Sequence, residues 1–245
     1  LGMVCLYLGW GGPLNILGHF SFTMHMLQMS ILFLALPPLI ILGVPAEWLR
    51  AVLKPKWVRK PFAFLSRPII AIVSFNFLFS LYHLPLLFDP IMSNYVLHVL
   101  THLILEVAAF LMWWPAVCPL EEMNRIGDLA KIGYILLNGV LLTPACALII
   151  FSDDAMYDLY ITGAGVLCLP FGYINLDMPQ VHSLLPMSVK ADQQGGGVLM
   201  KIAQEIIYGC GLAHVFFKWY RKEREKEREE DAQIDAPSPA LAGDR

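Results

Sequence analysis

The sequence predicts an all-α protein, a polytopic membrane helix bundle. Three features lead to this fold class. The 245 residues are 57% hydrophobic and only 15% charged, whereas about a quarter of the residues in a soluble domain are charged. Six of the 17 Lys and Arg residues lie between Arg50 and Arg67, and seven lie from Lys218 onward. Long apolar stretches separate these basic segments, as expected of membrane spans and loops.

The individual spans follow from the length of an apolar helix. About 20 apolar residues cross a bilayer as an α-helix. The sequence predicts one partial and five full spans within a membrane domain of residues 1–220, at 1–9, 17–43, 68–88, 96–118, 131–151 and 196–219. We expect the partial span to be the end of a helix that starts before Leu1. Pro37 and Pro38 predict a kink or an end in the first full span, because proline removes a backbone donor.

The basic residues also predict the orientation in the membrane. The loop 44–67 carries six basic residues against Glu47 alone, which places it in the cytoplasm. Alternation of the spans then puts 152–195 outside and the C-terminus inside, with 221–245 as a charged cytoplasmic tail. One alternative stays open, because 157–176 is apolar enough for another span. Its glycines and its proline favour a loop with partial helix.

Ionisable residues inside spans are costly, so each one is a candidate functional residue. His25 and Met29 are four residues apart and share a helix face, as do His98 and His102. In the predicted topology these residues and His83 lie at the outer ends of three different spans. Segments distant in sequence therefore bring imidazoles and thioethers to one membrane depth.

This combination of side chains points to copper, since histidine with methionine is a borderline-to-soft ligand set and the thioether favours Cu(I). Each residue also has an ordinary alternative role. A single membrane histidine often hydrogen-bonds a neighbouring helix, and methionine is a common packing residue. The cysteines are scattered without a CxxC pair, which predicts neither disulfides nor a zinc site. Nucleotide-binding and serine-hydrolase motifs are absent from the sequence.

Four segments carry a resemblance to a known family. They contain the motifs His-Met-Leu-Gln-Met, Tyr-His-Leu-Pro, Trp-Trp-Pro and Asp-Gln-Gln, within residues 25–45, 82–85, 102–115 and 192–200. Over most of residues 15–220 the chain resembles the CtaG family of bacterial cytochrome c oxidase assembly factors. It departs from the family pattern at Met29, where a second histidine is frequent, and at Thr101, where a glutamate is frequent.

The resemblance implies a seven-helix protein of the bacterial plasma membrane, with its first helix before Leu1. It also implies a role in assembling the respiratory oxidase and in supplying copper to oxidase subunits, which would be its partners. Membrane lipid is a further expected partner, a homo-oligomer stays open, and nucleic acid is not expected.

The leading hypothesis is an assembly factor, not an enzyme, that binds Cu(I) near the outer leaflet. Asp192 and Gln194 are expected to orient the imidazoles. The candidate ligands are His25, Met29, His83, His98 and His102. Three alternatives remain at this point: a metal-free scaffold for oxidase subunits, a membrane copper transporter, and a redox enzyme that binds haem or quinone.

Overall fold

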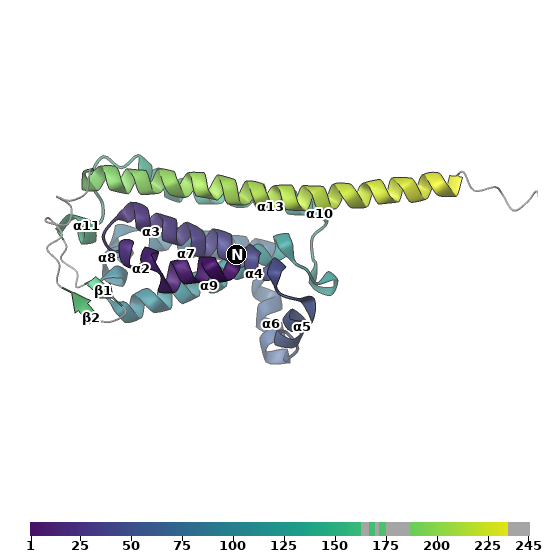
Figure 1. Cartoon of the computed structure of the whole chain (residues 1–245), viewed down its shortest axis with the longest axis horizontal. Coiled ribbons are helices and arrows are strands. Elements are labelled where there is room, and N and C mark those ends of the chain that lie inside the picture. The colour runs from purple at the N-terminus through teal and green to yellow at the C-terminus, as the bar shows by residue number, and fades with distance from the viewer. Residues whose placement is uncertain (163–166, 170–171, 175–186, 235–245) are drawn as a thin grey trace, which may run out of the picture.

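The computed structural model describes residues 1–162, 167–169, 172–174 and 187–234. Its helices pack side by side in one bundle, and the last helix runs along the bundle and continues well beyond it (Figure 1). The helices are α1 (Gly2–Leu6), η1 (Tyr7–Gly11), α2 (Pro13–Leu17), α3 (Phe22–Met29), η2 (Ser30–Ala35), α4 (Leu36–Gly43), α5 (Ala46–Val52), α6 (Lys56–Leu65), α7 (Pro68–Tyr82), α8 (Pro85–Met92), α9 (Tyr95–Val117), η3 (Glu121–Met123), α10 (Asp128–Ile150), α11 (Asp158–Thr162) and α13 (Val189–Ile234).

The predicted all-α membrane fold is confirmed. Among the described residues, Phe22–Gly43, Tyr95–Val117 and Asp128–Ile150 are long and apolar enough to cross a membrane. The pair α6 and α7 passes the same test together, although it is bent by 77°. These make three or four candidate spans, and the total of seven helices stays a prediction. The segment Gly2–Leu17, which contains the expected partial span, is a shorter apolar helix.

Particular side chains determine where the first full span begins and where its helix becomes irregular. The helix starts at Phe22 because Ser21 caps it, accepting a hydrogen bond from Met24 N at 3.4 Å. Before Pro37 the helix widens into the π-helical turns of η2. A proline lacks an N–H and clashes with the carbonyl one turn earlier, and a π-bulge accommodates such a break. The helix does not end at the prolines but continues to Gly43, and the irregularity before Pro37 consists of these π-helical turns.

The second full span is shorter than predicted. Helix α7 ends at Tyr82, His83 forms its C-cap, and Pro85 starts α8. The residue before a proline is disfavoured in α-helical conformation, and Leu84 is indeed extended. His83 thus lies in a bend between two helices.

The core lies where α9 and α13 meet the other helices. Helix α9 packs on α4, α7 and α10, and α13 packs on α3 and α10. The glycines near the start of α13 allow this approach, since a Cβ atom on Gly196 would lie 2.7 Å from Phe22 Cδ1. Beyond the bundle, α13 continues as the predicted charged helix, and Lys222 Nζ contacts Asp128 Oδ2 at 3.0 Å.

The two ends of the bundle differ in character. One end, which we call the histidine end, contains α8, α11 and a two-stranded hairpin of β1 (Leu167–Leu169) and β2 (Gly172–Ile174), in antiparallel register with Leu167 opposite Ile174. Helices α5, α6 and η3 lie at the opposite, basic end, where α13 leaves the bundle (Figure 1). Of the open segment 157–176, the described residues form a short helix and this hairpin, and the rest lies outside the described part.

Candidate metal centre

The hydroxyl of Tyr82 lies at the middle of a buried cluster at the histidine end. It lies 3.4 Å from His25 Nε2 and 3.3 Å from His102 Nε2, and it donates to Met92 Sδ at 3.3 Å. The Nε2 atoms of His98 and His102 are 3.0 Å apart. His25 is distant in sequence from His98 and His102, and the fold brings all three to the same cluster, as their shared position at one end of the predicted spans suggested.

Local structure explains how each element delivers its side chain. Asn94 caps α9 by accepting a hydrogen bond from Leu97 N at 3.1 Å, which places His98 and His102 on the first turns of the helix, facing inward. Tyr82 is the last residue of α7. His25 follows the cap of α3 by one turn.

Aspartate 192 holds the start of α3 in place. Its carboxylate accepts hydrogen bonds from Ser21 Oγ at 2.8 Å, from Phe22 N at 2.7 Å and from Thr23 N at 3.3 Å. Gln194 donates to the carbonyl of Ser152 at 3.2 Å. These two residues were expected to orient imidazoles directly. Their hydrogen bonds instead go to backbone and hydroxyl groups, and Asp192 positions His25 through α3.

Two further histidines border the cluster with one ring nitrogen free. His83 Nδ1 lies 2.8 Å from the carbonyl of Phe79, and His19 Nδ1 lies 2.7 Å from that of Asn15. A carbonyl only accepts, so each Nδ1 carries the proton and, in the neutral ring, each Nε2 keeps a lone pair. Both Nε2 atoms are buried and have no hydrogen-bond partner among the described residues, and the same holds for His25 Nδ1.

Aromatic side chains close the cluster from water. The ring of Phe88 lies edge-on to His25 with centroids 5.2 Å apart, and the indole of Trp10 lies edge-on to His102 at 5.9 Å. Tyr157 donates to the carbonyl of His83 at 2.8 Å. His25 is completely buried, and His102 is 2% exposed. Polar nitrogens without partners in such surroundings are unfavourable, which is typical of a site that awaits a ligand.

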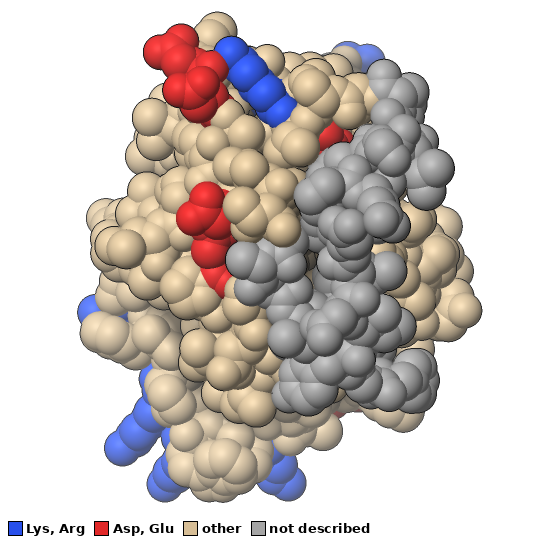
Figure 2. Space-filling view, turned by 90° about the vertical axis from the view of Figure 1, so that its left-hand side faces the viewer, with Lys and Arg blue, Asp and Glu red and all other residues tan. Residues whose placement is uncertain are grey.

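The exposed surface of the histidine end carries a few acidic side chains. Figure 2 looks onto this end and shows small groups of Asp and Glu on a mostly uncharged surface, with a basic side chain beside one of them. At its edge the carboxylate of Asp89 accepts hydrogen bonds from Asp158 N at 3.1 Å and Leu159 N at 3.3 Å. Partial burial raises the pKa of Asp89, against the lowering effect of those two hydrogen bonds. Negative charge near the cluster favours the approach of a cation.

The five predicted ligands differ in how the structure places them. His25, His83, His98 and His102 all lie in or beside the cluster. Met29 is also fully buried, one turn beyond His25, where it is part of the apolar core.

The sequence analysis missed Met92, whose thioether is the sulfur nearest Tyr82, and Tyr82 itself as the central residue. Tyr82 and Met92 belong to two different helices, α7 and α8, which meet at an irregular bend. Helical periodicity therefore could not predict their contact.

The geometry fits a metal ion in part. Two histidine nitrogens that coordinate the same metal ion, each at about 2.0 Å, are about 3 Å from each other. The Nε2 atoms of His98 and His102 are separated by this distance. Within the described part of the chain, however, three or more His, Cys, Asp or Glu side chains nowhere form a ready-made cage for an ion. The arrangement is thus one close pair of imidazole nitrogens, at hydrogen-bond distance from each other, with further polar side chains nearby.

The family model for the cytochrome c oxidase caa3 assembly factors, Caa3_CtaG, matches residues 1–222. This match covers the whole bundle. The chain belongs to the Caa3_CtaG family. The resemblance found in the four sequence motifs is thereby confirmed, and the family name connects the bundle with oxidase assembly.

No curated protein and no solved structure matches the chain. The histidine cluster of this Caa3_CtaG protein is therefore described from its own geometry.

Proposed function

We propose that this chain holds Cu(I) at the histidine end of its bundle and delivers it to a copper centre of cytochrome c oxidase. The observation that carries this proposal is the pair of Nε2 atoms of His98 and His102, 3.0 Å apart, within reach of a tyrosine-held histidine and thioether. The three buried ring nitrogens without partners support it.

The ligand set we propose differs from the sequence prediction at two residues, because Met92 replaces Met29 and His83 becomes a reserve ligand. His98 and His102 form the edge of the site, His25 approaches through Tyr82, and Met92 supplies the thioether. Imidazole and thioether together favour Cu(I) over zinc. His83 borders the site with a free Nε2 and is a reserve ligand, while Met29 is better suited to packing.

Delivery would occur by ligand exchange. A donor group on the oxidase subunit forms a bond to Cu(I) as one bond to His25 or Met92 breaks, and the copper remains Cu(I) throughout. No oxidant or reductant is needed, so the chain would act as a carrier and not as an enzyme. A site with only one close pair of imidazole nitrogens suits a carrier, because a complete cage would release its metal slowly.

The membrane orientation is part of the proposal. The basic end, with α5 and α6, would face the cytoplasm together with the C-terminus. The histidine end would then face the outside of the plasma membrane.

Copper retention tests the proposal. The protein is purified in detergent under reducing conditions, loaded with Cu(I), desalted and assayed for bound copper. We expect near-stoichiometric copper in the wild type and loss of most of it in His98→Ala/His102→Ala. His214→Ala, a histidine near the basic end that lies apart from the cluster, is the matched control and should retain copper. Equal copper in all three proteins would overturn the assignment.

A metal-free scaffold is the second candidate. It is favoured by the absence, among the described residues, of a ready-made cage of three or more ligands. The scaffold predicts that no variant binds copper and that His98→Ala/His102→Ala still supports oxidase assembly in cells. The carrier predicts that the same variant accumulates oxidase without its copper.

A further inference from the structure

A charged pair lies on α13, away from the histidine cluster. Lys201 Nζ contacts Glu205 Oε1 at 2.7 Å and donates to Thr143 Oγ1 of α10 at 2.8 Å. One turn along, Gln204 Nε2 donates to the carbonyl of Gly139 at 3.2 Å. These contacts set the depth of the pair relative to α10.

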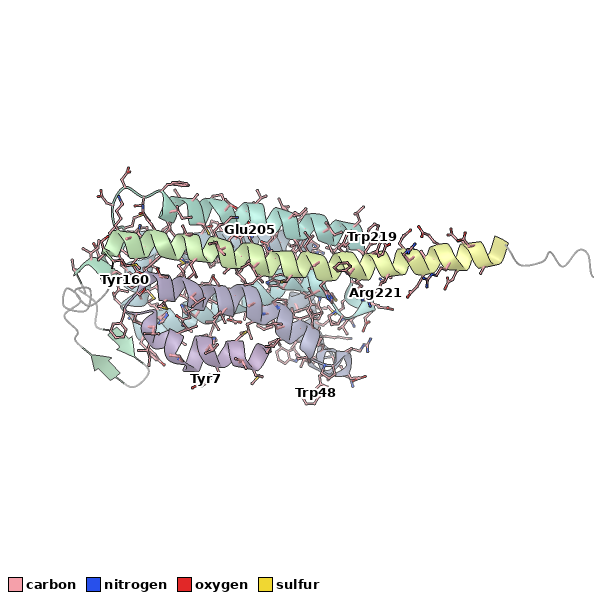
Figure 3. All side chains as sticks on the ribbon, turned by 45° about the horizontal axis from the view of Figure 1, so that its top comes forward. Tyr7, Trp48, Tyr160, Glu205, Trp219 and Arg221 are labelled. Carbon is pink, nitrogen blue, oxygen red and sulfur yellow. The ribbon has the colours of Figure 1, made fainter. Side chains whose placement is uncertain are left out.

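That depth is the middle of a candidate membrane span, because Gly139 is the central residue of α10, the candidate span Asp128–Ile150. Glu205 lies about midway along the part of α13 that runs beside α10, far from Trp219 and Arg221, where α13 leaves the bundle (Figure 3). The side chain of Glu205 is nevertheless 63% exposed, and that of Lys201 is 28% exposed. A charge at this depth is costly unless it has partners.

A groove beside the pair provides room for a partner. Its volume is about 230 Å³, and it lies between α10 and α13, lined by Gly139, Thr143, Lys201, Glu205, Tyr208 and Gly209. Tyr208, which also lines the groove, is only 5% exposed, and its buried hydroxyl has no hydrogen-bond partner within the described part of the chain. A Cβ atom on Gly209 would meet nothing within 4 Å, so the surface there is open. Small residues of this kind let a second helix approach closely.

We propose that this groove docks a transmembrane helix of the cytochrome c oxidase subunit that receives the copper. The helix would present a hydrogen-bond donor, such as Ser, Thr, Asn or Trp, to the exposed carboxylate of Glu205. The choice of an oxidase subunit rests on the proposed function. The inference that the groove binds a polar group of some partner does not depend on the proposed function, because it is drawn from the groove and the exposed Glu205 carboxylate.

A transmembrane helix fits this groove better than a phospholipid does. The polar headgroup of a phospholipid stays at the membrane surface, roughly 15 Å from the bilayer centre, and cannot reach Glu205. A helix can present a polar side chain at any depth, because its own backbone is fully hydrogen-bonded.

The test is co-purification of the full-length chain with each co-expressed oxidase subunit in detergent. Glu205→Gln should weaken retention of one subunit roughly 3- to 20-fold, the range found for single hydrogen bonds between membrane helices. Glu225→Gln, the same change on the charged extension of α13, is the matched control. Gly209→Leu should block docking by filling the groove, whereas Gly133→Leu on α10, equally open but outside the groove, should not.

A photocrosslinker at Leu212, which lines the groove, identifies the occupant. Crosslinks to an oxidase subunit that disappear in Gly209→Leu support the proposal. Crosslinks only between copies of this chain, only to lipid or quinone, or unchanged retention in both groove variants would overturn it. Copper retention is measured on the same proteins. If a groove variant retains copper but no longer retains the subunit, docking does not depend on the copper site. If the wild type retains the subunit but binds no copper, the proposed copper-carrier role is wrong and the docking proposal is still supported.

Discussion

At the scale of single residues, the candidate site depends on one hydroxyl group. Tyr82 donates its one proton to Met92 Sδ and also lies within hydrogen-bond distance of Nε2 of His25 and of His102. The hydroxyl thus holds two imidazoles and a thioether in place, while Nδ1 of His25 has no partner among the described residues. This suits side chains that must turn toward a metal ion and later release it.

Tyr82→Phe tests this role, since it keeps the ring packing and removes the hydroxyl. We expect the Cu(I) affinity to fall roughly tenfold, as on loss of other groups that orient metal ligands. A Cu(I) competition titration with a chromophoric chelator measures the affinity. The control is Tyr134→Phe, which removes a buried tyrosine hydroxyl bonded to the carbonyl of Met112, at 2.7 Å, and away from the cluster. Equal affinity in Tyr82→Phe and the wild type would show that the hydroxyl has no part in the site.

The residues of the site were predictable to different degrees. His98 and His102 share a helix face, and α9 is one long regular helix, so their pairing followed from periodicity. The contact between Tyr82 and Met92 depends on the bend after His83, whose direction no periodic pattern encodes. The free Nε2 of His83 likewise depends on the carbonyl exposed where α7 ends.

At the scale of elements, one carboxylate joins the last helix to the first full span. Asp192 lies at the start of α13, is 3% exposed, and caps α3 through Phe22 and Thr23. The sequence placed Asp192 at the correct depth but suggested the wrong contact, because a cap between elements about 170 residues apart leaves no local pattern. Similarly, the spans Phe22–Gly43, Tyr95–Val117 and Asp128–Ile150 followed closely from hydropathy, whereas the early end of α7 and the π-helical turns of η2 did not.

Asp192→Ala should destabilise the bundle at this junction. The change leaves two backbone N–H groups of α3 without their acceptor, and we expect a loss of about 1–2 kcal/mol, typical of a helix cap. Thermal unfolding in detergent measures the loss. Asp154→Ala, an exposed aspartate at the same end, is the control and should leave the midpoint unchanged. Because α3 carries His25, Asp192→Ala should also lower copper retention. If the variant is destabilised but retains as much copper as the wild type, Asp192 does not help to position the copper site.

At the scale of the whole molecule, two polar regions serve different purposes. The histidine cluster lies at one end, closed by aromatic rings, and the pair of Lys201 and Glu205 lies beside the groove between α10 and α13. The charge pattern predicted the spans and the two basic segments. The groove between α10 and α13 was not predictable, because it depends on how far apart two apolar helices pack.

The central claim is that His98, His102 and a nearby thioether hold one Cu(I). X-ray absorption at the copper edge of the loaded protein tests it most directly, with Met92→Leu and Met29→Leu measured alongside the wild type. The account predicts two or three nitrogen ligands near 2.0 Å, typical of imidazole, and one sulfur ligand that disappears in Met92→Leu but remains in Met29→Leu. A first shell without sulfur in the wild type, or one whose sulfur survives in Met92→Leu, would contradict the proposed site.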